Sequence, residues 1–140
     1  MFRSTALAAV AVFPLCSFAA PAHTVDCNAG QSLNRTLARM DKFSPATVAF
    51  SGTCTEYVVV DGFNNLTLTG REGAAIQQPI TNPPASPGYV LSVKSSRSIT
   101  LSGFAVRSQA NVFSSIGIGK GSADIVLRDI STDGSWGVVV

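Results

Sequence analysis

From Thr47 to the end of the chain, short apolar runs rich in β-branched residues alternate with Gly, Ser and Asn. Apolar runs of this length between turn-forming residues predict β-strands. No helical periodicity separates them, which excludes a fold that alternates strands with helices and leaves a sandwich, a barrel or a solenoid. The predicted strands are Thr47–Phe50, Tyr57–Val60, Leu66–Thr69, Val90–Val93, Ile99–Leu101, Ile116–Ile118, Ile125–Leu127 and Val138–Val140.

An internal repeat distinguishes among these folds. Three segments align without gaps, each reading small polar, apolar, Thr or Val, Leu, polar, then Gly or Asp: Asn65–Gly70, Ser98–Gly103 and Asp124–Asp129. Their starts are 33 and 26 residues apart. The same four-residue spacing joins each to a preceding strand end, at Val60-Asp61, Val93-Lys94 and Gly119-Lys120. Such a period, with two or three strands per unit, predicts a β-solenoid whose turns bury their apolar faces against one another.

The first interval is longer than the second because of an insertion between Gly70 and Val93. We expect this insertion to form a loop on one side of the coil. It contains the prolines Pro79, Pro83, Pro84 and Pro87.

One helix is predicted, over Ser32–Lys42, where Leu33, Leu37 and Met40 form a single apolar stripe and Pro45 follows. A stripe this narrow indicates a helix that covers another element rather than one buried inside a bundle.

Residues 1–22 have the pattern of a secretory signal peptide, which leaves residues 23–140 as the exported domain. Arg3 gives a positive start, an apolar run follows over Ala6–Phe13, and Ala20-Pro21-Ala22 is an A-x-A cleavage site. Ser17-Phe18-Ala19 is a second candidate site. We therefore predict a secreted, periplasmic or cell-surface protein. No later run approaches the ~18 apolar residues of a membrane span, so none is expected.

Two cysteines remain after the leader, Cys27 and Cys54. An even pair in an exported chain predicts a disulfide, which would close a loop of about 28 residues. A zinc site competes poorly, because His23 is the only histidine of the chain.

Composition narrows the function classes. The 140 residues are 46% hydrophobic and 13% charged, with 10 basic and 8 acidic residues and a net charge of +2. This composition excludes disorder, which needs many charges and few apolar residues. The basic residues are too few and too well matched by acids to predict a nucleic-acid binder.

The repeat, together with the segment from Asp26-Cys27 through Cys54 to Leu66–Gly70, resembles secreted bacterial proteins of the pectin lyase-like superfamily. The resemblance covers about residues 25–140. It implies an all-β fold, a right-handed parallel β-helix, in which the short helix caps the N-terminal end. The superfamily includes lyases, hydrolases, epimerases, adhesins and inactive members, so it implies no single activity. At the other end, Val138–Val140 completes no turn, and we expect either a fragment of a longer protein or an end covered by further β-helix turns or a partner chain.

Polysaccharide lyases of this superfamily resemble one another in using a calcium-binding carboxylate cluster and an Arg or Lys base. The candidates here are Asp124, Asp129 and Asp133, with Arg128 beside them. The repeat alignment favours another interpretation, because it places Asp124 and Asp129 at turns and Arg128 on the outer face. Calcium is expected only for a lyase, and otherwise no cofactor is predicted.

Glycoside hydrolases of the superfamily carry an Asn-Thr-Asp-Gly run, which Ser131–Gly134 matches only in part. No paired Asp and no later His follow, so the two-carboxylate reaction cannot be assembled from these residues. Trp136 and Tyr89 are candidates for stacking on sugars, although aromatic residues of small β proteins more often fill the core.

The sequence thus favours a secreted structural or binding module that engages extracellular polysaccharide or surface partners and has no complete active site. Two alternatives stay open. One is the N-terminal part of a polysaccharide lyase or glycoside hydrolase whose catalytic turns lie beyond residue 140, and the other is a surface adhesin or assembly module.

Overall fold

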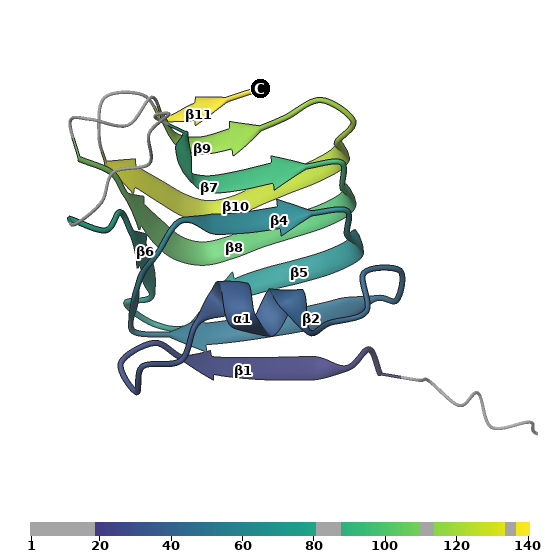
Figure 1. Ribbon diagram of the computed structural model, residues 1–140, viewed down its shortest axis with the longest axis horizontal. Helices are drawn as coiled ribbons and strands as arrows, with labels where there is room; N and C mark the ends of the chain where they lie inside the picture. Colours follow the sequence, from purple (N-terminus) through teal and green to yellow (C-terminus); the bar gives the residue numbers. More distant parts are fainter. Residues whose placement is uncertain (1–18, 81–87, 110–113, 134–136) are drawn as a thin grey trace, which may run out of the picture.

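The computed structural model describes residues 19–80, 88–109, 114–133 and 137–140, and most of them lie in strands (Figure 1). The all-β prediction is therefore confirmed, and each of the eight predicted strands is present. The elements are β1 (Ala22–Asp26), α1 (Leu33–Ala38), β2 (Ala46–Ser51), β3 (Thr53–Thr55), β4 (Val58–Asp61), β5 (Asn64–Gly70), β6 (Ala75–Gln77), β7 (Tyr89–Lys94), β8 (Arg97–Arg107), β9 (Ser114–Ile118), β10 (Ala123–Asp133) and β11 (Val138–Val139).

The strands form two sheets, and every strand pairing in the described residues is parallel. The larger sheet has the order β1-β2-β5-β8-β6-β3, with β10 also paired to β8, and the smaller sheet has the order β11-β9-β7-β4. From β4 onward the chain crosses repeatedly between the two sheets, so that strands far apart in sequence lie one above another (Figure 1).

The strand register places the three repeat segments directly over one another. Leu66 pairs with Ile99, and Ile99 pairs with Ile125. The next inward position repeats the arrangement, with Leu101 between Leu68 and Leu127. Side chains in adjacent parallel strands at the same register share a face, so these positions form continuous apolar columns in the core. The three segments that align without gaps in the sequence therefore also align in the strand register of the structure.

The small polar residue that opens each repeat has a physical role. Asn65, Ser98 and Asp124 adopt positive φ angles of 66°, 55° and 56°. The left-handed region disfavours bulky residues and accepts Asn, Asp and small polar residues more readily. Gly103 and Asp129, at the end of the second and third repeats, also have positive φ, of 71° and 50°, within the long strands β8 and β10.

One detail of the predicted repeat is wrong. Val93 pairs with Ile118, so the next residue, Lys94, aligns with Gly119 and not with Lys120. The turn before the third repeat is therefore longer than the turn before each of the other two. The Gly119 amide donates to the Val93 carbonyl at 2.7 Å, and Gly121 takes a φ of 80° in the longer turn. Lys94 and Lys120 match in the sequence alignment, but they occupy different positions in the structure.

The inserted segment of the first repeat is only partly described, because residues 81–87 lie outside the described ranges. Part of it forms the turn at Arg71–Gly73 and the strand β6, which pairs with the second half of β8.

The helix α1 is shorter than the predicted Ser32–Lys42. Ser32 is its N-cap and accepts from the Arg35 amide at 3.2 Å, while Leu33 and Leu37 are buried. Met40 lies past the helix but is still buried. The helix lies beside β1 and β4 at the end of the molecule away from β11 (Figure 1).

Candidate functional site

The four residues considered for lyase chemistry all lie on β10. Asp124 and Asp129 occupy its two left-handed positions, and Arg128 and Asp133 are exposed. Five residues of strand span up to about 16 Å, so the carboxylates of Asp124 and Asp129 are spread along the strand rather than gathered. Among the described residues, these aspartates do not form a group of three carboxylates close enough to share a metal ion.

The backbone carbonyl of Asp133 holds neighbouring segments together by hydrogen bonds. Its carbonyl accepts from the Ser108 amide and hydroxyl at 3.0 and 2.7 Å and from the Ser115 hydroxyl at 3.1 Å. These bonds join the end of β10 to β9 and to the segment after β8. They give Asp133 a structural role that does not depend on its carboxylate.

Of the two aromatic candidates, Trp136 lies outside the described residues. Tyr89 begins β7, and its ring covers Gly117 of β9 so closely that a Cβ built on Gly117 would lie 2.3 Å from ring carbons. One face of the Tyr89 ring is therefore occupied by the protein itself.

The predicted disulfide joins Cys27 to Cys54, with the Cα atoms 5.0 Å apart. Glu56 lies near the two sulfurs, and these three residues are the single metal-sized cluster found in the described parts of the chain. The sulfurs are bonded to each other. The Glu56 carboxylate accepts from the Ser32 hydroxyl and from the amides of Leu33 and Asn34. The cluster is a structural junction and not a metal site.

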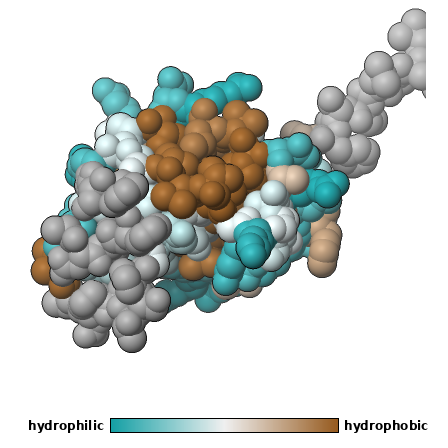
Figure 2. Space-filling model, turned by 90° about the horizontal axis from the view of Figure 1, so that it is seen from above, coloured by the Kyte–Doolittle hydropathy of each residue, from teal (hydrophilic) through white to brown (hydrophobic). Residues whose placement is uncertain are grey.

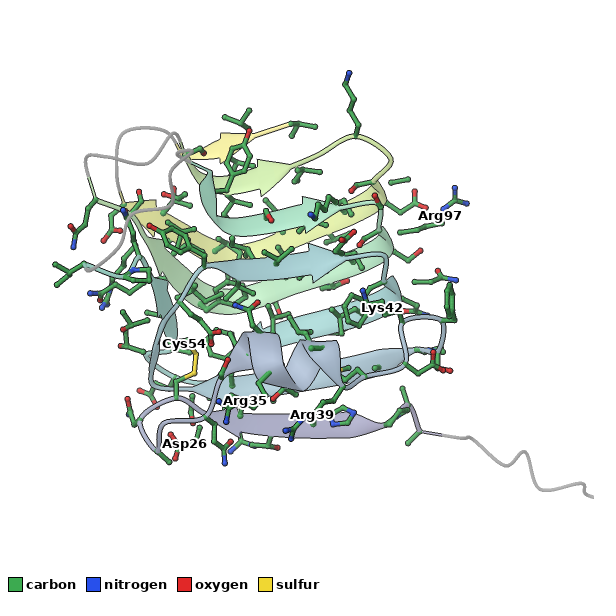
Figure 3. All side chains as sticks on the ribbon, in the orientation of Figure 1. Asp26, Arg35, Arg39, Lys42, Cys54 and Arg97 are labelled. Atoms are coloured by element: carbon green, nitrogen blue, oxygen red, sulfur yellow. A yellow bond between two sulfur atoms is a disulfide. The ribbon has the colours of Figure 1, made fainter. Side chains whose placement is uncertain are left out.

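A cleft of about 550 Å³ lies between α1 and β1. Two arginines of the α1 segment, Arg35 and Arg39, and the histidine of β1, His23, line it. Figure 3 shows the two arginines where the helix and β1 come together. The other lining residues are Thr24, Gly30, Gln31, Ser32, Thr36 and Met40.

The electrostatic character of the cleft follows from this lining. None of its lining residues is acidic, and the ion pair found in the described residues, Lys94 with Asp61 at 3.6 Å, lies elsewhere. Arg35 and Arg39 are exposed, so both guanidinium groups are free to meet a ligand from solvent. A guanidinium presents a planar set of N–H donors that matches carboxylate, sulfate and phosphate groups. The cleft is thus suited to an anionic ligand with hydroxyl groups.

Sequence reasoning missed this cleft. Arg35 and Arg39 lie within the predicted helix, and their i, i+4 spacing was a visible signal. His23 directly follows the predicted leader, and no local pattern showed that β1 would lie beside the helix.

One carboxyl group of the described residues has a clearly shifted pKa. The hydroxyl of Ser44 and the backbone amide of Phe43 lower the pKa of Asp41 below its ordinary value by hydrogen bonding to the charged form. Asp41 is exposed in the turn after α1 and does not line the cleft.

No protein-family model, curated protein or solved structure matches this chain. The similarity to the pectin lyase-like superfamily therefore stays a prediction from the repeat. Within the described part of the chain, no helix has the length and apolar character needed to cross a membrane.

Proposed function

We propose that the chain is an exported module of a right-handed parallel β-helix with a binding role, and that it engages acidic extracellular polysaccharide. Three observations support the β-helix. All the described pairings are parallel, the chain crosses between two sheets, and Leu66, Ile99 and Ile125 stack in register. Export is supported by the leader pattern at residues 1–22 and by the Cys27–Cys54 disulfide.

The observation that carries the binding role is the cleft beside α1, where Arg35, Arg39 and His23 surround a hollow that no acidic residue lines. A uronate or a sulfated sugar supplies the anionic groups that arginines bind in pairs. The Thr24 hydroxyl supplies a neutral partner for a sugar hydroxyl, whereas the hydroxyls of Ser32 and Thr36 already donate to Glu56 and to the Ser32 carbonyl. The spread of the candidate carboxylates along β10 gives no comparable support to a catalytic role.

The test compares binding to a polyuronate with binding to a neutral glucan, by calorimetry at two salt concentrations. We expect binding to the polyuronate that weakens as salt rises, because exposed charges are screened. The variant Arg35→Ala/Arg39→Ala should weaken it at least tenfold. Arg35→Lys/Arg39→Lys should restore only part of it, because lysine keeps the charge and loses the paired donors.

Arg71→Ala/Arg97→Ala is the matched control, since both arginines are exposed and neither lines the cleft. It should bind like the unaltered chain. Equal affinity for the neutral glucan, or no loss in the Arg35→Ala/Arg39→Ala variant, overturns the proposal. Release of unsaturated sugars from the polyuronate would replace it by the lyase alternative.

A further inference from the structure

The cleft between α1 and β1 is rich in hydrogen-bond donors. It lies at the α1 end of the molecule, whereas apolar side chains gather at the β11 end (Figure 2). Arg35 belongs to α1 and Arg39 is its C-cap, and neither guanidinium bonds to another described residue. A guanidinium carries five N–H donors and no acceptor. Residues four apart on a helix are neighbours, about 5–6 Å apart at Cβ, so one ligand group can meet both arginines.

Gln31 adds a third donor group to the lining of the cleft. Its side-chain oxygen accepts a hydrogen bond from the Asp26 amide at 2.8 Å. The NH₂ group is therefore the half of the Gln31 amide that has no partner among the described residues, and it can donate two hydrogen bonds.

Acceptors are scarce in the same lining, which contains no carboxylate. The Ser32 hydroxyl oxygen already accepts from the Arg35 amide at 3.2 Å. The oxygen and nitrogen acceptors left among the lining side chains are the hydroxyl oxygens of Thr24 and Thr36 and one ring nitrogen of a neutral His23. A ligand that complements this lining brings many acceptors and few donors.

This requirement separates two kinds of acidic sugar. A uronate keeps its ring hydroxyls, which are donors as well as acceptors, and its carboxylate has two oxygens in one plane that a single guanidinium can occupy. Esterification of a hydroxyl with sulfate or phosphate removes the hydroxyl hydrogen. It adds a tetrahedral group whose terminal oxygens all accept hydrogen bonds and point in different directions. Such a group can be shared by several donor side chains.

We propose that the cleft prefers a tetrahedral oxyanion ester on the polysaccharide, a sulfate or a phosphate, to a uronate. This inference rests on the proposed binding function and narrows its ligand. Arg35 and Arg39 bind the oxygens of the ester, and the NH₂ group of Gln31 donates to an oxygen that the guanidiniums leave free. Uronates bind the same arginines more weakly.

The experiment compares polymers that share one neutral backbone and differ in the anionic group. Dextran sulfate, dextran phosphate and carboxymethyl dextran, matched in length and total charge, are titrated into the purified chain by calorimetry, with unmodified dextran as the neutral reference. We expect one or both of the esters to bind at least tenfold more tightly than carboxymethyl dextran. The tighter of the two identifies the ester.

Gln31→Ala tests the third donor. It should reduce the preference for the ester at least threefold and leave the affinity for carboxymethyl dextran unchanged. Gln77→Ala is the matched control, because Gln77 lies in β6 and does not line the cleft. It should keep both affinities, and circular dichroism of each variant should match that of the unaltered chain.

The outcomes separate this inference from the proposed function. Carboxymethyl dextran that binds within tenfold of both esters, or a preference that Gln31→Ala leaves intact, overturns the inference and leaves the proposed function standing. Equal affinity for all four polymers overturns both.

Discussion

The Glu56 carboxylate accepts a hydrogen bond from the Ser32 hydroxyl, the N-cap of α1, at 2.8 Å. It also accepts from the amides of Leu33 and Asn34 at 2.7 and 3.3 Å. The first amides of a helix have no partner within the helix, and a negative charge there is favourable. Glu56 therefore fastens the helix to the segment that follows the disulfide.

We predict that Glu56→Ala lowers the free energy of unfolding by about 1–3 kcal/mol, because it leaves helix amides unpaired. Urea denaturation followed by circular dichroism measures the change. Glu72→Ala removes an equal charge from an exposed turn and should change stability by less than about 0.5 kcal/mol. Equal losses in the two variants would show that Glu56 does not act through α1.

The disulfide gives a second prediction. Its cysteines are 27 positions apart, and closing a loop of that size contributes about 3–4 kcal/mol in the chain-entropy model. Cys27→Ser/Cys54→Ser should lose about that much stability, and a reductant should lower the melting temperature of the unaltered chain by a similar amount. The reductant should not affect the double variant. A double variant as stable as the unaltered chain would contradict the prediction.

The positive φ angles of the residues that open the repeats predict that these positions accept glycine but not a β-branched residue. Ser98 has a φ of 55°, where glycine is unstrained and a β-branched residue is not. Ser98→Gly should retain the stability of the unaltered chain, whereas Ser98→Val should lose about 1–2 kcal/mol. Ser102→Val on the same strand is the control, because Ser102 is not among the residues with positive φ. A comparable loss at both positions would rule out a backbone effect.

Most of the repeating fold was predictable because its columns are built from one local pattern. Leu66, Ile99 and Ile125 face the core in successive repeats, so the same apolar spacing recurs in the sequence. The strands β1, β3 and β6 were missed since they are short or mixed in polarity, and pairing with neighbours makes them strands. The cleft was also missed because tertiary packing alone brings its two sides together, with His23 on β1 and Arg35 on α1.

The contact between Tyr89 and Gly117 predicts a size limit at position 117. A Cβ there would lie 2.3 Å from the Tyr89 ring, so Gly117→Ala must displace the ring or the strand. We expect a loss of about 1–3 kcal/mol, recovered in part when Tyr89→Ala is added. Gly119→Ala is the control, because its nearest neighbour, the Lys94 Cβ, lies at an ordinary 3.5 Å. Additive losses for Gly117→Ala and Tyr89→Ala would contradict this explanation.

The first strand bears on where the predicted leader would be cleaved. Ala22 pairs with Thr47, and the Pro21 carbonyl accepts from the Thr47 amide at 3.0 Å. Cleavage after Ala22 would remove the first residue of β1 and the Pro21 carbonyl before it, and leave the charged amino group of the new terminus on His23, beside the cleft. Cleavage after Ala19, at the Ser17-Phe18-Ala19 site, keeps the whole strand.

For the export proposed above, we therefore predict a mature chain that begins at Ala20, which N-terminal sequencing or an intact mass of the secreted chain would show. Signal peptidase needs a small residue immediately before the cut. Ala19→Leu should accordingly block normal processing, whereas Ala22→Leu should leave it unchanged, since Ala22 is exposed in β1 and lies past the cut. A mature chain that begins at His23, with processing lost in Ala22→Leu and kept in Ala19→Leu, would show that β1 forms without Pro21 and Ala22.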